Sequence, residues 1–216
     1  MAEMGISLAG NPLPLPAVTN NPPENTLFDE EWKHRSPYHI QSPDEFGPIQ
    51  WRARCQCGRV SYALNRPQPL NAKFCHCRGC QVMHGAPLQW AAIFHKSDLS
   101  FARGFSGLQF YSASQNSQNY HTPTKVSCEF CRTPIMDEGR NVCLIFPQLI
   151  EFSGSQDEQR KQREVFMPTC HIFYEQRMLD IPDGKPKWSG MDQDSDLLDD
   201  SGRVIQQKST DVTPPL

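Results

Sequence analysis

Three cysteines lie within six positions of the segment "FCHCRGCQVMHG", residues 74–85: Cys75, Cys77 and Cys80. Thiolates spaced as C-x-C-x-x-C can bind a zinc ion, because tight turns present neighbouring sulfurs to one metal. A closed structural zinc site has four protein ligands, whereas a catalytic site keeps one position open. The segment therefore raises the question whether a fourth ligand exists elsewhere in the chain or whether that position is open.

Four further cysteines form two close pairs, Cys55 and Cys57 in "CQCG" and Cys128 and Cys131 in "CEFC". With the first three they make seven possible ligands, which divide naturally into four plus three. Joining the two pairs gives a closed site and leaves an open three-cysteine site, although the spacing alone permits other partitions. Gly58 favours a turn around a metal, since glycine adopts unusual backbone conformations at little cost.

Other interpretations of the seven cysteines are a purely structural module with two zinc ions, a redox dithiol, or chance. A redox pair needs only two cysteines and leaves the others unexplained. If the second zinc were only loosely held, the three cysteines of residues 74–85 would behave as redox-sensitive thiols. The remaining two cysteines, Cys143 and Cys170, lie in apolar segments and are expected to be small core residues.

The elements that must position these cysteines are mainly β-strands. Short segments rich in branched and aromatic residues alternate with turn residues, as is typical of a mainly β domain. The expected strand segments are "RVSYALN", "LQWAAIFHKSDLSF", "GLQFYSA", "TKVSCEF", "NVCLIFPQLIEF" and "PTCHIFYEQRMLDI". Residues 157–166, "DEQRKQREVF", are the best helix candidate, with a polar loop as the alternative.

Irregular segments flank this domain on both sides. Residues 1–49 are rich in proline and are expected to form a flexible arm, although "LFDEEWKHR" can make a helical turn that docks through Trp32. Residues 191–216 form an acidic and polar tail, expected to be loop-like. The sequence thus predicts an arm at 1–49, a zinc domain at 50–190 and a tail at 191–216.

Composition limits the classes of partner. The chain has 216 residues and a net charge of −3, which gives no electrostatic reason to expect nucleic acid or an anionic membrane as partner. No segment approaches the roughly 18 apolar residues that span a bilayer, and the N-terminus lacks the pattern of a signal peptide. We therefore expect a cytoplasmic, reducing location, where clustered cysteines are more often metal ligands or catalysts than disulfides.

The order of the motifs resembles a known family. C-x-C-G, then C-H-C-x-x-C-Q followed by Gly85, then C-x-x-C, is similar to the glutathione-dependent formaldehyde-activating enzyme (GFA) family, whose domain is shared with centromere protein V. "LQFYSAS" and "HIFYEQRMLDIPDGKPKW" add to the likeness, which covers about residues 50–190. The resemblance implies a mainly β fold of packed antiparallel sheets of the GFA type, stabilised by zinc.

The resemblance also implies two zinc ions per chain and a role for each cysteine. The structural zinc would be bound by Cys55, Cys57, Cys128 and Cys131, and the catalytic zinc by Cys75, Cys77 and Cys80. The sequence departs from the family at Arg132, which stands where members usually have glycine directly after the last C-x-x-C. The turn around the structural zinc is therefore expected to differ there.

The implied activity is that of a carbon–sulfur lyase-type enzyme acting on thiol adducts of aldehydes or related electrophiles, with glutathione as the implied thiol. Zinc would lower the pKa of the thiol and orient it. Three basic residues lie near the ligands in the sequence: Arg59, Lys73 and Arg78. Each could pair with a carboxylate of glutathione, although an exposed and solvated side chain is the more ordinary expectation for each. His76 is a weak catalytic candidate, as a hydrogen-bond donor to a ligand sulfur.

Four other histidines rank below His76, because the sequence connects none of them to the site: His84, His95, His121 and His171. His171 lies in an expected strand and is expected to be a hydrogen-bonded core or edge residue. The alternative function is a zinc-stabilised binding module without catalysis, like the centromere protein V branch. A module that binds microtubules or nucleic acid would favour a basic surface, so the negative charge favours the enzyme and a small-molecule partner.

Overall fold

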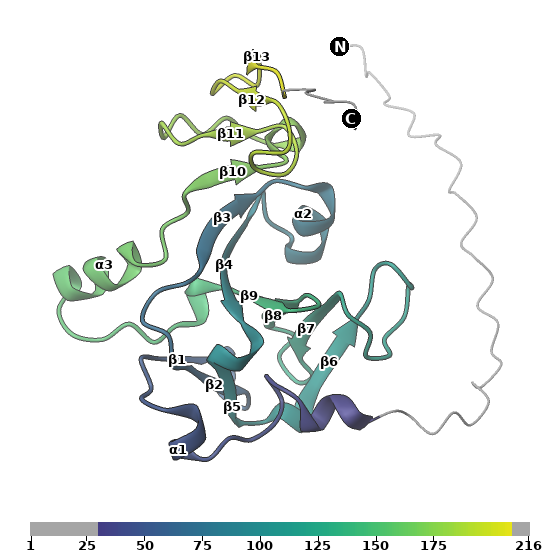
Figure 1. The fold of residues 1–216 in the computed structure, drawn as a ribbon, viewed down its shortest axis with the longest axis vertical. Helices are drawn as coiled ribbons and strands as arrows, with labels where there is room; N and C mark the ends of the chain where they lie inside the picture. Colours follow the sequence, from purple (N-terminus) through teal and green to yellow (C-terminus); the bar gives the residue numbers. More distant parts are fainter. Residues whose placement is uncertain (1–29, 209–216) are drawn as a thin grey trace, which may run out of the picture. The chain divides into compact units, whose positions relative to one another are not determined.

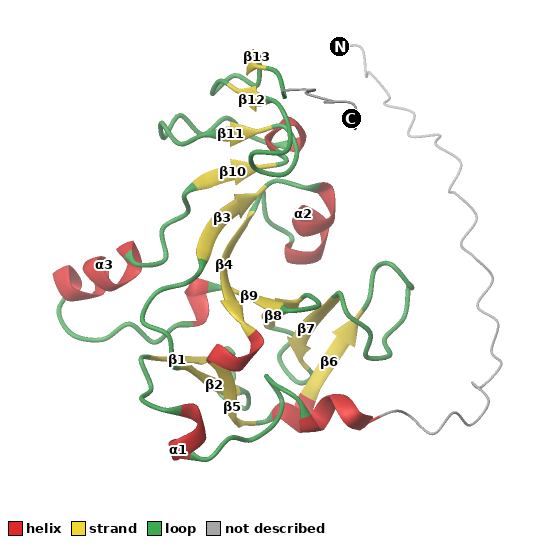
Figure 2. Cartoon of the chain, in the orientation of Figure 1, coloured by secondary structure: helices red, strands yellow, loops and turns green. Residues whose placement is uncertain are grey.

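The computed structural model describes residues 30–208 of the chain, so most of the expected proline-rich arm lies outside the described residues. Within that range the protein has thirteen strands, three α-helices and five short 3₁₀ helices (Figures 1 and 2). The predicted mainly β fold is confirmed. None of the helices in the described range has the length and apolar character needed to cross a membrane.

The smaller sheet has three antiparallel strands in the order β1-β2-β5: Trp51–Arg54, Ser61–Leu64 and Leu99–Arg103. The larger sheet has ten strands, in the order β13-β12-β11-β10-β3-β4-β9-β8-β7-β6. Its first five strands along the chain are β3 (Asn71–Cys75), β4 (Gln89–His95), β6 (Leu108–Tyr111), β7 (Thr124–Cys128) and β8 (Pro134–Glu138). The others are β9 (Val142–Ile145), β10 (Cys170–Ile172), β11 (Lys187–Trp188), β12 (Leu197–Leu198) and β13 (Val204–Gln206).

The larger sheet is mixed rather than purely antiparallel, because β10 runs parallel to both β3 and β11. Parallel neighbours need a long return connection. Between β9 and β10 the chain passes through a 3₁₀ helix, Pro147–Leu149, and α3, Gln156–Glu164. Between β10 and β11 it passes through the 3₁₀ helix Tyr174–Gln176 and the loop that follows. The second connection hydrogen-bonds to the three-cysteine segment through Gln176.

The hydrophobic core lies between the two sheets. The smaller sheet contributes Ala53, Tyr62, Leu64, Leu99 and Phe101, and the larger sheet contributes Ala72, Ala92, Phe94, Val126, Ile135, Met136, Cys143 and Ile145. Both apolar cysteines outside the clusters are buried, as expected: Cys143 is in this core and Cys170 is in β10. Burial raises the pKa of the Cys143 thiol, which is consistent with an unreactive core residue.

The segment before β1 packs against this core. The 3₁₀ helix Glu30–His34 brings Trp32 against Tyr38, Phe110 and Tyr120, so the predicted docking through Trp32 is confirmed. Tyr38 is fully buried, and its hydroxyl donates to Glu138 at 2.7 Å. A short helix, α1 (Pro43–Phe46), follows and begins with a capping box at Ser42. Part of the expected arm is therefore folded.

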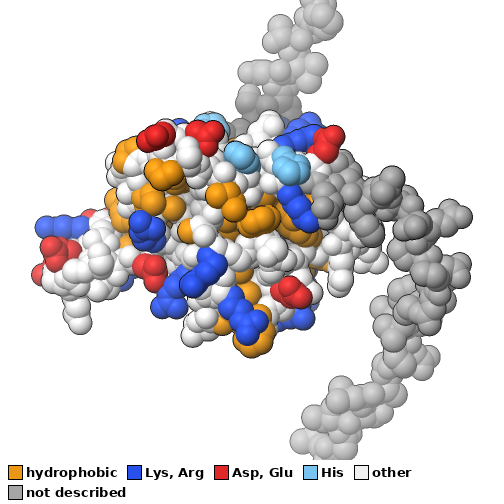
Figure 3. Space-filling model, turned by 90° about the horizontal axis from the view of Figure 1, so that it is seen from below, with side chains coloured by type: hydrophobic (Ala, Val, Ile, Leu, Met, Phe, Trp, Pro, Cys, Tyr) orange, Lys and Arg blue, Asp and Glu red, His pale blue; other side chains and the backbone are white. Residues whose placement is uncertain are grey.

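The helix predicted at 157–166 is also present, as α3 at Gln156–Glu164, with Ser155 as its N-cap. The prediction of a loop-like tail is wrong for part of its length, because β12 and β13 extend the larger sheet beyond β11 (Figure 1). Leu198 is buried there, which gives this otherwise polar segment an apolar anchor. On the face seen in Figure 3, basic and acidic side chains are interspersed.

Candidate metal centres and the adjoining pocket

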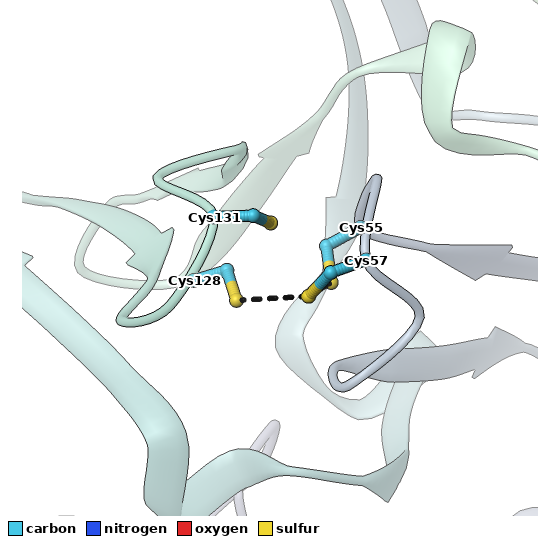
Figure 4. A group of neighbouring side chains, drawn as sticks. All are labelled: Cys55, Cys57, Cys128 and Cys131. Atoms are coloured by element: carbon cyan, nitrogen blue, oxygen red, sulfur yellow. Dashed lines mark hydrogen bonds between the residues drawn. The ribbon is translucent and has the colours of Figure 1, made fainter.

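The two cysteine pairs meet between two turns. Cys55 and Cys57 lie in the turn from β1 to β2, Cys128 ends β7, and Cys131 lies in the turn from β7 to β8. Their side chains point toward one another (Figure 4), and all four sulfurs lie within 4.8 Å of one another. The Sγ atoms of Cys55 and Cys57 are 3.4 Å apart, and those of Cys57 and Cys128 are 3.9 Å apart. The cluster therefore joins the smaller sheet to the larger one.

Two residues with left-handed backbone shape these turns. Gly58 has φ +73°, the conformation for which glycine is suited. Arg132 has φ +62°, although a side chain there is unfavourable. Hydrogen bonds orient the sulfurs: the Val60 N–H donates to Cys55 Sγ at 3.3 Å, and the Thr133 hydroxyl lies 3.1 Å from Cys131 Sγ. The turn thus keeps at Arg132 the backbone conformation that glycine adopts most easily.

The three remaining cysteines surround the start of helix α2 (Arg78–His84). Cys75 ends β3, Cys77 is the N-cap residue, and Cys80 lies in the first turn. The Cys80 N–H donates to Cys77 Sγ at 3.4 Å, and the three sulfurs lie within 4.8 Å of one another. Cys75 and Cys77 are half-buried and Cys80 is buried. In residues 30–208 no fourth metal-ligating side chain joins this group.

Electrostatics of the three thiols favour a shared cation. Hydrogen bonds from Cys75 and Cys80 lower the pKa of Cys77, and hydrogen bonds with Cys75 and Cys77 raise the pKa of Cys80. One thiolate is thus stable in this group, whereas a second or third thiolate is repelled by the first. A divalent ion removes that repulsion.

The donor sets fit zinc. A tetrahedron with zinc–sulfur bonds of 2.3 Å has sulfurs about 3.8 Å apart, and both groups are within 4.8 Å before any ion draws them together. Soft thiolates favour zinc over magnesium or calcium. Both cysteine clusters could therefore hold a metal ion, one with four protein ligands and the other with three.

A pocket of about 260 Å³ is connected to the three-cysteine cluster through Lys125, although none of the three cysteines lines it. Its lining includes Met83 and His84 from α2, Lys125 from β7, Asp137 from β8, and Arg132. The Lys125 ammonium lies 4.0 Å from Cys80 Sγ and 2.5 Å from the Asp137 carboxylate. Burial opposes the charge on Lys125, but Asp137 and Cys80 outweigh it and raise the pKa of the amine. A permanent cation therefore stands between the cluster and the pocket.

Two buried polar atoms near this pocket, His84 Nε2 and Gln89 Oε1, form no hydrogen bond of ordinary geometry within the described residues, but the two side chains lie close enough to interact with each other. His84 lines the pocket, and its ring packs edge-on against Phe146. The amide nitrogen of Gln89 donates to Asp137 at 2.8 Å, so the amide oxygen is the atom left to interact with His84.

The structure places the basic candidates from the sequence away from the pocket. Lys73 forms an ion pair with Asp192. The Arg59 guanidinium stacks over Phe130 at 3.6 Å from the ring centre, beside the four-cysteine cluster. Arg78 is exposed on α2, and two low-ranking histidines, His95 and His121, are exposed as well.

His76 is 1% exposed, and its Nε2 lies 2.8 Å from His171 Nδ1, so this nitrogen bonds another histidine and not a sulfur. His171 is buried in β10 with hydrogen bonds from both ring nitrogens, as expected of a core histidine. Sequence reasoning missed that it contacts His76, and it also missed Lys125. These partners are 95 and 45 residues away from His76 and Cys80, and no local spacing indicates them.

A family model matches more than half of this chain. The model of the glutathione-dependent formaldehyde-activating enzyme family matches residues 50–176. A search of curated proteins gave no match. One solved structure, the crystal structure of a Rhodobacter sphaeroides protein, is 21% identical and has a TM-score of 0.39, covering 49% of this chain and 93% of its own.

Proposed function

The chain belongs to the glutathione-dependent formaldehyde-activating enzyme family, and from this membership we propose that it is a zinc-dependent enzyme of carbon–sulfur lyase type. Its substrates would be thiol adducts of aldehydes or of related small electrophiles, with a glutathione-like thiol. The observation that carries the proposal is the three-sulfur group without a fourth ligand among residues 30–208, beside a pocket.

Each cysteine cluster has its own role in this proposal. The closed cluster would hold a structural zinc through Cys55, Cys57, Cys128 and Cys131. The open cluster would hold a second zinc through Cys75, Cys77 and Cys80, which, when bound, supplies a Lewis acid and a place for a substrate sulfur to bind as thiolate. A reducing compartment such as the cytoplasm would keep all seven thiols available.

The reaction in the adduct-forming direction joins the sulfur of a thiol to the carbonyl carbon of an aldehyde. The carbon–sulfur bond forms, the C=O π bond breaks, and the thiol proton ends on the carbonyl oxygen; the reverse direction breaks the carbon–sulfur bond. Lys125, charged and 4.0 Å from Cys80 Sγ, would stabilise negative charge at this side of the cluster. Arg132 lines the same pocket and would pair with a substrate carboxylate.

His84 and Gln89 would orient a polar group of the substrate. His84 lines the pocket and interacts with the Gln89 side chain, so a polar group of a peptide-like thiol would hydrogen-bond to the His84 ring there.

The test combines zinc content with catalysis. We expect two zinc ions per wild-type chain by elemental analysis and about one in Cys77→Ser, with the fold kept. Exchange between glutathione, ¹³C-formaldehyde and S-hydroxymethylglutathione, followed by NMR, should be accelerated by the wild type and not by Cys77→Ser.

Cys143→Ala is the matched control, since Cys143 is a buried cysteine of the core outside both clusters. It should keep both zinc ions and the catalysed exchange. Two zinc ions without any accelerated exchange would contradict the enzyme and favour a binding module. One zinc in the wild type would contradict the open site itself.

A further inference from the structure

A buried chain of hydrogen bonds begins between two cysteines of the open cluster and ends at a carboxylate far along the sequence. His76, which separates Cys75 from Cys77, has its Nε2 at 2.8 Å from His171 Nδ1. The other ring nitrogen of His171 lies 3.1 Å from one oxygen of Asp183 and 3.2 Å from the other. The two imidazoles are 1% and 0% exposed, so water does not compete for the bond between them.

Asp183 is held as a carboxylate by three donors. The Lys187 ammonium, itself buried, lies 3.1 Å from Asp183 and 2.7 Å from Asp200. The backbone N–H of Lys185 donates to the same carboxylate at 3.1 Å. Burial opposes the charge of Asp183, but the hydrogen bonds from His171, Lys185 and Lys187 outweigh it and lower its pKa to about 2. At neutral pH this carboxylate therefore only accepts hydrogen bonds.

Because Asp183 only accepts, it determines which atom donates in each hydrogen bond of this buried series. His171 Nε2 must carry its hydrogen, because it donates to Asp183. Burial lowers the pKa of His171 despite the nearby carboxylate, so the ring is neutral and its Nδ1 is an acceptor. His76 then donates from Nε2. Tyr174 packs against both rings, with centroids 5.0 Å from His76 and 5.5 Å from His171, and limits their rotation.

The backbone of the same segment is held as well. The His76 N–H donates to the Ile172 carbonyl at 3.0 Å. The Gln81 amide donates to the His76 carbonyl at 2.7 Å and to the Gln176 carbonyl at 2.8 Å. The Gln176 side chain accepts from the Arg78 N–H at 2.8 Å. Residues 171–183, from the end of β10 and the connection to β11, thus hydrogen-bond to the backbone of the cysteine loop and to the buried imidazole of His76.

An open metal site needs such support more than a closed one does. Four protein ligands fix each other through the metal, whereas three leave one direction unconstrained, so the neighbouring structure must hold the loop rigid. We propose that His171 and Asp183 are positioning residues for the three-cysteine site, which lock His76 and thereby hold Cys75 and Cys77 in their zinc-binding arrangement. The inference rests on the proposed function for the second zinc.

The test measures zinc release from the purified, zinc-loaded full chain. Transfer of zinc to the chromogenic chelator 4-(2-pyridylazo)resorcinol should show two phases in the wild type, and Cys77→Ser identifies the phase that belongs to the open site. We expect Asp183→Asn and His171→Gln each to accelerate that phase about 10-fold and to leave the other phase unchanged. The double variant should release zinc no faster than the single variants, because either change already breaks the chain.

Asp194→Asn is the control for the loss of an ion-paired carboxylate. Asp194 is exposed and pairs with Lys208, outside the buried chain of hydrogen bonds, so its loss should change neither phase. If Asp183→Asn accelerates both phases and also lowers the melting temperature, the residue has a general structural role and the positioning proposal is overturned. If the wild type releases two zinc ions and both single variants match it, positioning fails and the proposed function stands. A single zinc in the wild type overturns both.

Discussion

At the scale of the residue, Arg132 stands out because its backbone and its side chain have opposite preferences. A φ of +62° favours glycine, and a side chain there costs about 1–2 kcal/mol. Backbone strain of this kind gathers at functional sites. Arg132 lines the pocket that Lys125 connects to the open cluster. Recognition of an anionic ligand would explain why this position carries arginine.

Arg132→Gly should separate the effect of backbone strain on stability from the effect of the side chain on ligand binding. Relief of strain, partly offset by the greater entropy of glycine in the unfolded chain, should leave the melting temperature equal or higher by about 1–4 °C. Binding of a carboxylate-bearing thiol should weaken, as measured by calorimetry with glutathione. Arg140→Gly, an exposed site where φ is not positive, should lower the melting temperature slightly and leave binding unchanged. A clear loss of stability in Arg132→Gly would contradict the argument from strain.

Asp183 makes a prediction about acid. Its folded pKa of about 2 is below the ordinary value of 3.8, so its contribution to stability is complete above about pH 4 and is lost as the pH falls toward 2. Asp183→Asn lacks this contribution at every pH. The difference in urea midpoint between wild type and variant should therefore be largest above pH 4 and should shrink as the pH falls below it. A difference that stays constant from pH 7 to pH 2 would show that the charge of Asp183 is not involved.

At the scale of the element, the segment before β1 depends on one buried carboxylate. Glu138 in β8 accepts from Tyr38 at 2.7 Å, from Tyr120 at 2.8 Å and from Lys96 at 2.6 Å, and its side chain is fully buried. Tyr38 also stacks on Phe101 of β5. One tyrosine thus ties the N-terminal segment to both sheets.

Tyr38→Phe should test the hydrogen bond between Tyr38 and Glu138. The ring contacts remain, but Glu138 loses one of its three donors, so we expect a loss of about 1–2 kcal/mol in the free energy of unfolding. Denaturant titration would measure it. Tyr111→Phe is the control, because the Tyr111 hydroxyl bonds Asn116 in an exposed hairpin and its loss should have almost no effect. Equal stability of the two variants would mean that Glu138 does not need the Tyr38 hydroxyl.

About half of the strands were predictable: the expected segments contain all or most of β2, β4 to β7, β9 and β10, but not β1, β3, β8 or β11 to β13. The contacts between elements were not predictable. Alternation in "RVSYALN" predicts β2, and Ser155 with Glu158 forms the capping box that begins α3. No such local signal indicates that Lys125 lies beside Cys80 or that His171 contacts His76, because those neighbours come together only when β7 and β10 take their places in the sheet. Parallel pairing of β10 is unpredictable for the same reason: it depends on the route of a long connection.

At the scale of the molecule, the cysteine clusters occupy different structural positions within residues 31–208. The four-cysteine group joins the β1–β2 turn of the smaller sheet to the β7–β8 turn of the larger one. The three-cysteine group lies within one local segment, at the junction of β3 and α2. Loss of a metal from the first should loosen the packing between sheets, whereas loss from the second should change a local loop.

Metal removal should therefore act in two stages. A cysteine-bound structural zinc contributes directly to folding free energy, so we expect Cys57→Ser to lower the melting temperature far more than Cys77→Ser, and to weaken the near-ultraviolet circular dichroism that reports packing of the core aromatics. Treating the wild type with 1,10-phenanthroline should first abolish the catalysed exchange, when one zinc has been removed, and only later unfold the chain, when the second follows. The first stage should be reversed by added zinc without a refolding step, since the sheets stay joined. Loss of fold together with the first zinc, or equal destabilisation by the two serine variants, would show that both clusters hold the sheets together and that neither is free for chemistry.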